Sequence, residues 1–330
     1  MKLRETAAYL FVRAIKRTIW TIGGGVMDAR RFGLHFAAES TALKALFCWH
    51  TSPNLFEKKH ENIFRFLEEH FAEEIKTIET TSLHYEPQAV RHIWVMWWQG
   101  FDHAPALVKK CDALLMERSE GYRITLLDKD NYKQYVDIPG YITDKFNAGK
   151  IPIANYSDVI RMALLCKYGG FWIDSTVLLL NGWDKGYVDY PFFSIKNHLS
   201  CIDGAVSKFR FATFFMYSKK GNSFFELMTK FLFAYWKRFD KTVDYMLIDY
   251  VMLLICQHNE EFQKMLNDVP YSNENVHSLR NHMNEEYTSK RWNEYTKETE
   301  VFKLTYKQYL IPTCKQKVEL SLLDHFLSDY

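Results

Sequence analysis

Residues 156–180 restrict the fold more than any other stretch of the chain, because they combine a helical pattern, a glycine stop and an apolar run. Ser157 is a favourable helix N-cap. Asp158 and Arg161 stand three residues apart, so both side chains project from the same face of the first helical turn. We therefore expect a polar pair beside a pocket at the start of this helix.

A single carboxylate follows the apolar run. Gly169 and Gly170 end the helix, residues 171–173 are apolar, and Asp174 comes directly after them. An unpaired buried carboxylate is costly, so Asp174 is expected where the strand meets a ligand, a cation or a solvated cleft. In the alternative, structural interpretation, Asp174 caps a turn or pairs with a lysine.

The preceding segment predicts parallel strands joined by helices. A strand at 93–98, a helix from near Pro105 to just before Gly121, and a strand at 123–127 form a βαβ unit. The strand before Asp174 extends this unit to βαβαβ, which favours an α/β fold with a mostly parallel central sheet flanked by helices. Later in the chain the pattern predicts strands at 192–195, 209–216 and 301–306, helices at 223–238 and 243–258, and a final short helix.

We expect a helical accessory region, 1–86, followed by a main domain, 87–330, whose C-terminal part is helical. The first helix carries apolar residues on one face and basic residues on the other. Seven basic and two acidic side chains in residues 1–31 give a local charge of +5. That charge suits peripheral contact with an anionic membrane through residues 1–22. Alternatively, the apolar face packs on the core.

The composition argues against several classes of protein. Forty-two basic and 40 acidic residues give a net charge of +2, which is too balanced for nucleic acid as a partner. No uncharged apolar run reaches the length of about 18 residues that a membrane span needs. The six cysteines contain no Cys-x-x-Cys pair and read as reduced thiols. We therefore expect a cytoplasmic protein, peripheral on the inner face of the cytoplasmic membrane.

Several catalytic motifs are missing from the sequence. It has no phosphate-binding glycine loop, no closely spaced histidine pair of the zinc-hydrolase type, and no Gly-x-Ser-x-Gly elbow. An ATPase, a dehydrogenase, a zinc hydrolase and a serine hydrolase are therefore not supported.

An aromatic pair, Trp97 and Trp98, ends the first predicted strand and is followed by Gln99 and Gly100. An indole at this strand end can stack on a nucleobase, an interaction worth about 1–3 kcal/mol in nucleic-acid sites. Because alternate residues of a strand face opposite sides, at least one of the two tryptophans is expected to fill the core instead.

Three ordered motifs together resemble the capsular polysaccharide synthesis glycosyltransferases, which are related to glycosyltransferase family 32 and its DXD sugar-binding region. The motifs are residues 93–100, Ser157-Asp158-x-x-Arg161, and residues 168–174. The resemblance implies a GT-A-like fold and a hexosyltransferase that uses a nucleotide-sugar donor, most simply a UDP-sugar, with retention of configuration. The implied acceptor is a capsular or other surface polysaccharide, lipid-linked in our interpretation.

The resemblance also implies roles for individual residues. Asp158, Arg161 and Asp174 would be catalytic, and Asp249 and Asp244 are candidates for acceptor binding or for supporting the site. The donor would contact a larger set, namely Trp97, Trp98, Gln99, Gly100, Tyr156, Asp158, Arg161, Gly170, Asp174, Ser175 and Thr176.

The metal requirement is left open by one departure from the motif. Asp174 matches the first carboxylate of DXD and is the metal-ligand candidate for Mn²⁺ or Mg²⁺, but Thr176 stands where the second carboxylate is expected. A threonine hydroxyl is a weak ligand for such hard cations. A catalytically silent scaffold of a polysaccharide-assembly complex is therefore the alternative function, whereas a nucleotidyltransferase would need a second carboxylate beside Asp174.

Overall fold

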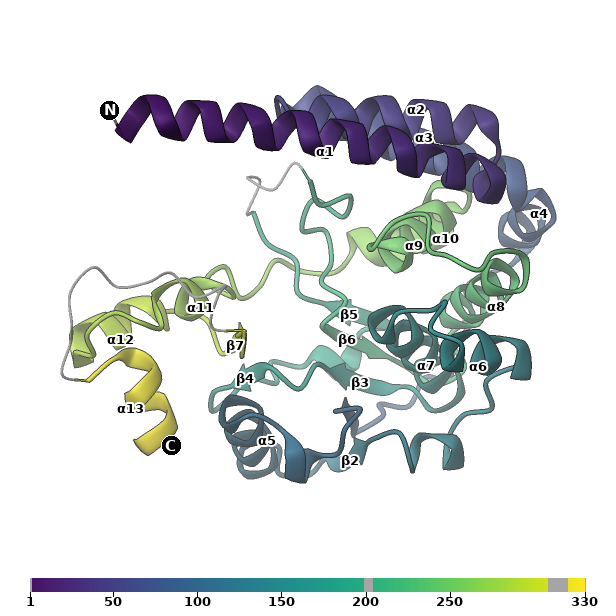
Figure 1. Ribbon diagram of the computed structural model, residues 1–330. Coiled ribbons are helices and arrows are strands. Elements are labelled where there is room, and N and C mark those ends of the chain that lie inside the picture. The colour runs from purple at the N-terminus through teal and green to yellow at the C-terminus, as the bar shows by residue number, and fades with distance from the viewer. Residues whose placement is uncertain (1, 199–203, 308–319, 330) are drawn as a thin grey trace.

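The computed structural model describes residues 2–198, 204–307 and 320–329, with residues 2–13 and 329 described by their backbone alone. A five-stranded sheet in the order β2-β1-β3-β6-β5 lies at the centre of the fold (Figure 1). Only β6 runs antiparallel to its neighbours. The strands are β1 (His92–Met96), β2 (Arg123–Leu127), β3 (Gly170–Ile173), β5 (Phe192–Ser194) and β6 (Phe215–Ser218). The expectation of an α/β fold with a mostly parallel central sheet flanked by helices is confirmed.

The sheet reverses its strand order between β1 and β3. The first crossover places β2 on one side of β1, and the second places β3 on the other side. The connecting helices are α5 (Ala106–Arg118), α6 (Gly140–Asn147) and α7 (Ile153–Tyr168), with short 3₁₀ turns η1 (Phe101–His103) and η2 (Tyr132–Gln134). In open α/β sheets, ligands bind outside the carboxyl ends of the strands at such a reversal.

The second half of the chain adds helices and a small second sheet. After η3 (Tyr187–Asp189) and β6, the helices α8 (Ser223–Arg238), α9 (Leu247–Gln257) and α10 (Glu260–Asn267) pack on the central sheet and its helices. Strand β4 (Val177–Leu179) pairs antiparallel with β7 (Val301–Lys303). Around this small sheet lie α11 (Ser278–His282), α12 (Ser289–Tyr295) and α13 (Leu322–Asp329), on the same side of the molecule as the C-terminus (Figure 1).

Four helices form the N-terminal layer, namely α1 (Lys2–Phe32), α2 (Leu34–Phe47), α3 (Pro53–His70) and α4 (Ala72–Thr80). Phe32 and Phe66 pack with Phe239, which follows α8, at ring-centroid distances of 5.7 and 5.3 Å. The hydrophobic core is therefore continuous from this layer into the sheet. The division of the chain at residue 86 stays a prediction.

Helix α1 packs on α2 through small and polar residues rather than through its isoleucines. A Cβ atom added to Gly25 would lie 2.3 Å from Thr41 Oγ1, so the two helices approach closely at this point. Ile19 and Trp20 are 65% and 84% exposed. In the described part of the predicted apolar face, Ile15 and Ile22 are also exposed, so packing of these isoleucines on the core is wrong. In the described residues, no helix is both long and apolar enough to cross a membrane.

Several predicted boundaries need correction. Helix α7 begins at Ile153 after Pro152, so Ser157 is a residue of the helix interior and not its N-cap. Proline before or at the first turn suits a helix start because its missing N–H has no partner there. The strand expected at 209–216 is β6, which begins only at Phe215, and the helix expected at 243–258 begins at Leu247.

Candidate functional site

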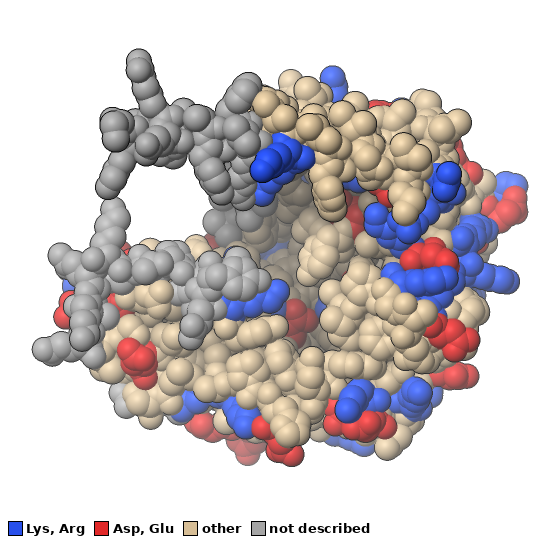
Figure 2. All heavy atoms as spheres, in the orientation of Figure 1, with Lys and Arg blue, Asp and Glu red and all other residues tan. Residues whose placement is uncertain are grey.

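A cleft of about 720 Å³ lies at the carboxyl ends of β1 and β3, where the strand order reverses. Its walls come from the start of α7, the segment 205–214, the start of α9, part of α11, and residues 303–307 after β7. In the space-filling view the molecule is hollowed between the helical layer and the sheet, with acidic side chains in the hollow and basic ones at its edge (Figure 2).

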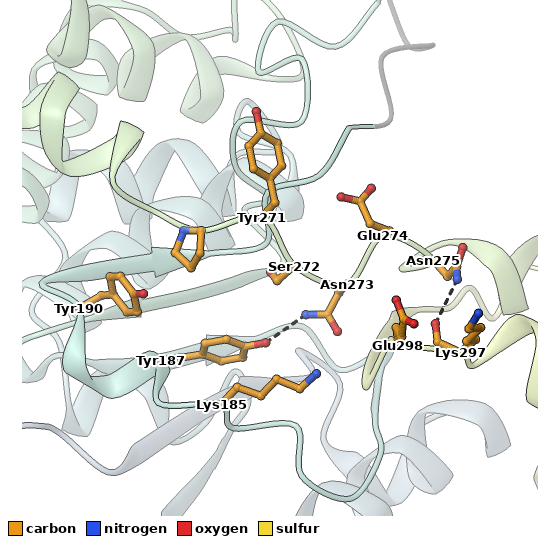
Figure 3. Close-up of a pocket in the computed structure, with 11 residues that line it drawn as sticks. Lys185, Tyr187, Tyr190, Tyr271, Ser272, Asn273, Glu274, Asn275, Lys297 and Glu298 are labelled. Carbon is orange, nitrogen blue, oxygen red and sulfur yellow. Dashed lines mark hydrogen bonds between the residues drawn. The ribbon is translucent and has the colours of Figure 1, made fainter.

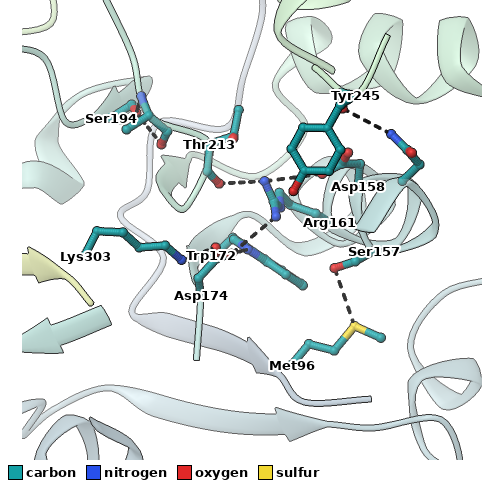
Figure 4. Close-up of polar contacts among 12 residues, drawn as sticks. Met96, Ser157, Asp158, Arg161, Trp172, Asp174, Ser194, Thr213, Tyr245 and Lys303 are labelled. Atoms are coloured by element: carbon teal, nitrogen blue, oxygen red, sulfur yellow. Dashed lines mark hydrogen bonds and ion pairs between the residues drawn. The ribbon is translucent and has the colours of Figure 1, made fainter. Parts of the chain in front are cut away.

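Asp174 lies in the cleft, and nitrogen donors engage both of its carboxylate oxygens (Figure 4). Its Oδ1 accepts hydrogen bonds from Trp172 Nε1 at 2.8 Å and from Arg161 Nη2 at 3.3 Å. Its Oδ2 lies 2.6 Å from Lys303 Nζ. Burial alone would raise the pKa of Asp174, but the charges of Lys303 and Arg161 and these hydrogen bonds outweigh it and hold the pKa below its ordinary value.

Arg161 joins the two motif aspartates. Besides Asp174, its guanidinium contacts Asp158 Oδ1 at 3.5 Å and donates to the carbonyl oxygen of Thr213 at 2.7 Å. The guanidinium also lies over the ring of Trp172, 4.8 Å from its centroid. Arg161 is only 7% exposed. Nη1 and Nη2 both contact acceptors within the protein, whereas the buried Nε has no hydrogen-bond partner among the described residues. The first effect of Arg161 is therefore to hold the two carboxylates in place.

Two further carboxyl groups in the cleft titrate near neutral pH. Burial raises the pKa of Asp158 to about 6, against the attraction of Arg161 and with a further contribution from Asp174. Burial also raises the pKa of Asp249, on the first turn of α9, to about 7, and the charge of Asp158 adds to this effect. The two aspartates thus disfavour each other's ionisation, as expected of neighbouring carboxyl groups.

The basic residues that complete the cleft are not among those predicted from the sequence. Lys303, Lys307 and Arg280 line it, so the described part of the cleft holds four basic groups, with Arg161, against three aspartates. Among the described residues, Arg280 forms no ion pair, and its buried Nε has no hydrogen-bond partner. Lys303 lies 129 residues after Asp174 in the chain, and nothing in the sequence pattern places its segment beside Asp174.

The two tryptophans after β1 have different surroundings. Strand β1 ends at Met96, so both lie in the turn that follows it. Trp98 packs against Tyr132, Phe146 and Tyr156, with ring centroids 5.0–5.8 Å apart, and helps to fill the core. Trp97 meets Tyr306 edge to face at 5.3 Å. Both tryptophans line the cleft, but Trp97 is the one with an aromatic partner from the cleft wall.

The cleft brings together most, but not all, of the residues proposed from the sequence. Gln99, Ser175 and Thr176 line it beside the residues already described. Four others do not line it: Gly100, Tyr156, Gly170 and Asp244.

Three of these four residues have a structural role elsewhere. Tyr156 is buried and bonded to the Tyr132 hydroxyl at 2.7 Å. Gly170 has a φ of 87°, and a Cβ there would lie 2.4 Å from the carbonyl oxygen of His92. Asp244 pairs with Lys59 at 2.7 Å, away from the cleft lining.

The donor set around Asp174 does not fit the Mn²⁺ or Mg²⁺ that the resemblance implies. A nitrogen donor faces each of its oxygens, and the nearest equivalent of the second carboxylate is the hydroxyl of Thr176, which is 8% exposed. In the part of the chain that the structure describes, no three His, Cys, Asp or Glu side chains are grouped to hold a metal ion. Such ions favour carboxylate oxygens and water.

A second pocket of about 440 Å³ lies beside η3 and the segment after α10 (Figure 3). Tyr187, Tyr190 and Asn273 line it, and the Asn273 amide lies 3.3 Å from the Tyr187 hydroxyl. The amide oxygen of Asn273 accepts hydrogen bonds from the backbone of Glu300 and Val301. These contacts hold the start of β7 in position, and none of the residues proposed from the sequence lines this pocket.

The fold and the cleft define an α/β protein with a polar ligand site at the switch point of a mostly parallel sheet. The model of a protein family described as capsular polysaccharide synthesis protein matches residues 46–323, and the chain belongs to this family. Membership suggests a role in capsule biosynthesis. Comparisons with curated proteins and with solved structures found no match.

Proposed function

We propose that the protein is a glycosyltransferase of GT-A type that moves a hexose from a nucleotide-sugar, a UDP-sugar in the first instance, to a capsular or other surface polysaccharide. One observation carries the proposal: Trp97 after β1 and Asp174 after β3 flank the switch point of the sheet and share one cleft. An aromatic side chain for the base and a cluster of charged groups for the phosphates and sugar are what such a donor requires.

The chemistry assigned to the cleft is the stabilisation of a leaving group. The bond between the anomeric carbon and the diphosphate breaks, the nucleoside diphosphate leaves with the electron pair, and the acceptor oxygen bonds to that carbon. The basic side chains that line the cleft offset the charge that grows on the diphosphate. Asp158 orients the sugar hydroxyls. Asp249, whose pKa burial raises to about 7, is the candidate to take the proton of the acceptor hydroxyl.

A lipid-linked acceptor is supported by the surface of α1. Its described part exposes Ile19, Trp20, Ile22 and Val26, all more than half exposed, beside the basic residues of the same helix. An exposed apolar helix face with neighbouring Lys and Arg matches an anionic membrane surface. We propose that α1 holds the protein at the cytoplasmic face of the membrane, where such an acceptor is displayed. Retention of configuration rests on the family resemblance alone.

A screen of nucleotide-sugars tests the proposed activity. Thermal shift and donor hydrolysis are measured with UDP-, GDP- and CMP-sugars, each with Mn²⁺ and with EDTA. We expect one nucleotide class to raise the melting temperature and to be hydrolysed slowly, and Asp174→Asn to lose turnover while remaining folded. The matched control is Asp268→Asn, which removes an exposed carboxylate that pairs with Lys264. A silent scaffold, the alternative function, would show neither a donor-dependent shift nor hydrolysis.

A further inference from the structure

The ammonium group of Lys303 occupies the position at Asp174 where a cation would be expected. Lys303 Nζ lies 2.6 Å from Asp174 Oδ2, and the Lys303 side chain is only 19% exposed. The two residues belong to neighbouring segments of the cleft wall, since Asp174 precedes β4 and Lys303 ends β7. The pair is therefore part of the built wall of the cleft and not an exposed surface contact.

The backbone fixes the position of Lys303. In the pairing of β4 with β7, Lys303 stands opposite Val177, and its N–H donates to the carbonyl oxygen of Val276 at 2.8 Å. The next residue, Leu304, donates to the carbonyl oxygen of Thr176 at 2.9 Å. The segment that contains Thr176 is thus bonded directly to the segment that supplies the ammonium group.

The ammonium group retains capacity for a ligand. A lysine ammonium has three N–H donors, and Asp174 is the hydrogen-bond acceptor that the structure gives to Lys303 Nζ. Phe214 covers one side, with its ring centroid 5.3 Å from the nitrogen. Arg280 lines the same cleft and, among the described residues, has no carboxylate partner. Two cationic groups of the cleft can therefore bind phosphate oxygens.

We infer that the cleft binds the diphosphate of its nucleotide donor without a divalent cation, with Lys303 in the place of the metal and Arg280 as a second cationic ligand. The inference rests on the proposed function and narrows it. It explains why Thr176 can replace the second carboxylate of the DXD pattern, since an ammonium group held by one carboxylate needs no second one.

Calorimetric titration with UDP, GDP and CDP, each in EDTA and in Mg²⁺ or Mn²⁺, tests the inference. We expect the Kd of the preferred nucleotide to change less than about twofold between EDTA and metal, and to rise at least tenfold in Lys303→Met. Lys185→Met is the matched control, because Lys185 also forms a 2.7 Å ion pair, with Glu300, but lines the second pocket. Its nucleotide affinity should equal that of the unmodified protein.

A double variant separates binding by Lys303 from simple neutralisation of Asp174. Asp174→Asn combined with Lys303→Met removes one charge of each sign, so the net charge of the cleft is unchanged and no carboxylate is left unpaired by the loss of Lys303. If Lys303 only neutralises Asp174, the double variant regains normal affinity, which overturns the inference. We expect it to fold, by its melting curve, and to remain at least tenfold weaker.

The titrations with and without metal also distinguish a failure of this inference from a failure of the proposed function. Nucleotide binding that requires Mn²⁺ or Mg²⁺ overturns the metal-free site and leaves the proposed transferase standing. A protein that binds none of the three nucleotides, with or without metal, removes the proposed function, and the metal-free site falls with it.

Discussion

Arg161 and Asp174 form an ion pair, with Arg161 Nη2 3.3 Å from Asp174 Oδ1, that ties helix α7 to the end of strand β3. The same guanidinium also reaches Asp158 and the backbone of Thr213. The structure therefore uses one buried cation to hold both motif aspartates and the segment that leads into β6. Whatever binds in the cleft meets a prearranged group of charges, as electrostatic stabilisation of a leaving group requires.

Replacing Arg161 should consequently destabilise the fold as well as the site. In Arg161→Met, two carboxylates lose their shared counter-charge, and removing one partner of a buried pair typically costs about 3–5 kcal/mol. We expect urea denaturation to show a large drop in the midpoint. Lys264→Met removes an exposed pair at 2.6 Å and should leave the midpoint nearly unchanged. Equal midpoints for the two variants would contradict the central role of Arg161.

Asp158 and Asp249 in the cleft predict a free energy of unfolding that falls as the pH rises. Burial raises the pKa of Asp158 to about 6 and of Asp249 to about 7, both above the ordinary value of 3.8. At pH values between about 4 and 7, these two residues therefore bind more protons in the folded protein than in the unfolded chain. The contribution is complete below about pH 4 and is lost as the pH rises through 6 and 7.

The Asp249→Asn variant isolates the contribution of Asp249 to this pH dependence, because the asparagine side chain has no charge to bury. We expect the variant to be more stable than the unmodified protein at pH 8 and to differ little at pH 4, and the gain to be on the order of a few kcal/mol in the free energy of unfolding. Urea midpoints measured from pH 4 to pH 8 give the comparison. Asp130→Asn, at an exposed position, is the control and should show no such trend. A pH-independent difference for Asp249→Asn would refute the prediction.

The local parts of the site could be predicted from the sequence, whereas its long-range parts could not. The path from α7 through Gly169 and Gly170 to Asp174 is contiguous, so helix, stop and strand signals are sufficient to trace it. The partner of Asp174 is 129 residues away, brought close by the pairing of β4 with β7. Two three-residue strands carry too little periodicity for that pairing to be predicted.

Two predictions from the sequence, the N-cap at Ser157 and the core-facing isoleucines of α1, are wrong for local physical reasons. Ser157 is a good N-cap residue, but the helix begins after Pro152, five residues before Ser157. The sequence does not distinguish a serine inside a helix from a serine that caps one. In α1 the isoleucines indicate a core-facing stripe, yet the close approach at Gly25 selects a face of small residues for packing on α2. Hydrophobic periodicity does not distinguish a face that packs on protein from one that is left exposed.

Gly170 predicts a strong effect of a single methyl group on the sheet. Its φ of 87° is unfavourable for other residues, and a Cβ would lie 2.4 Å from the carbonyl oxygen of His92, a backbone atom of the neighbouring strand β1. Gly170→Ala should therefore disturb the pairing of β1 with β3 and displace Asp174. Gly149→Ala is the control, since its φ is 71° but nothing lies within 4 Å of the added atom.

The two alanine variants then separate the cost of a left-handed backbone from the cost of the steric clash with strand β1. We expect Gly149→Ala to lose about 1–2 kcal/mol, the cost of a left-handed backbone for an L-residue, and Gly170→Ala to lose clearly more. Thermal and urea unfolding give both values. Similar losses in the two variants would show that the close approach of the strands is easily relaxed.

The exposed face of α1 predicts a specific membrane phenotype. Trp20 is 84% and Ile19 65% exposed, so replacing both with glutamate removes apolar surface and adds negative charge at little cost to the fold. We expect the Ile19→Glu/Trp20→Glu variant to lose flotation with anionic liposomes and to keep its melting temperature, and a chain lacking residues 1–22 to behave likewise. Met116→Glu, at a 47% exposed position of α5, should float normally. Equal flotation of the unmodified protein and these three variants would eliminate α1 as a membrane contact. Flotation with neutral liposomes as strong as with anionic ones would eliminate the basic residues of α1 as the source of attraction.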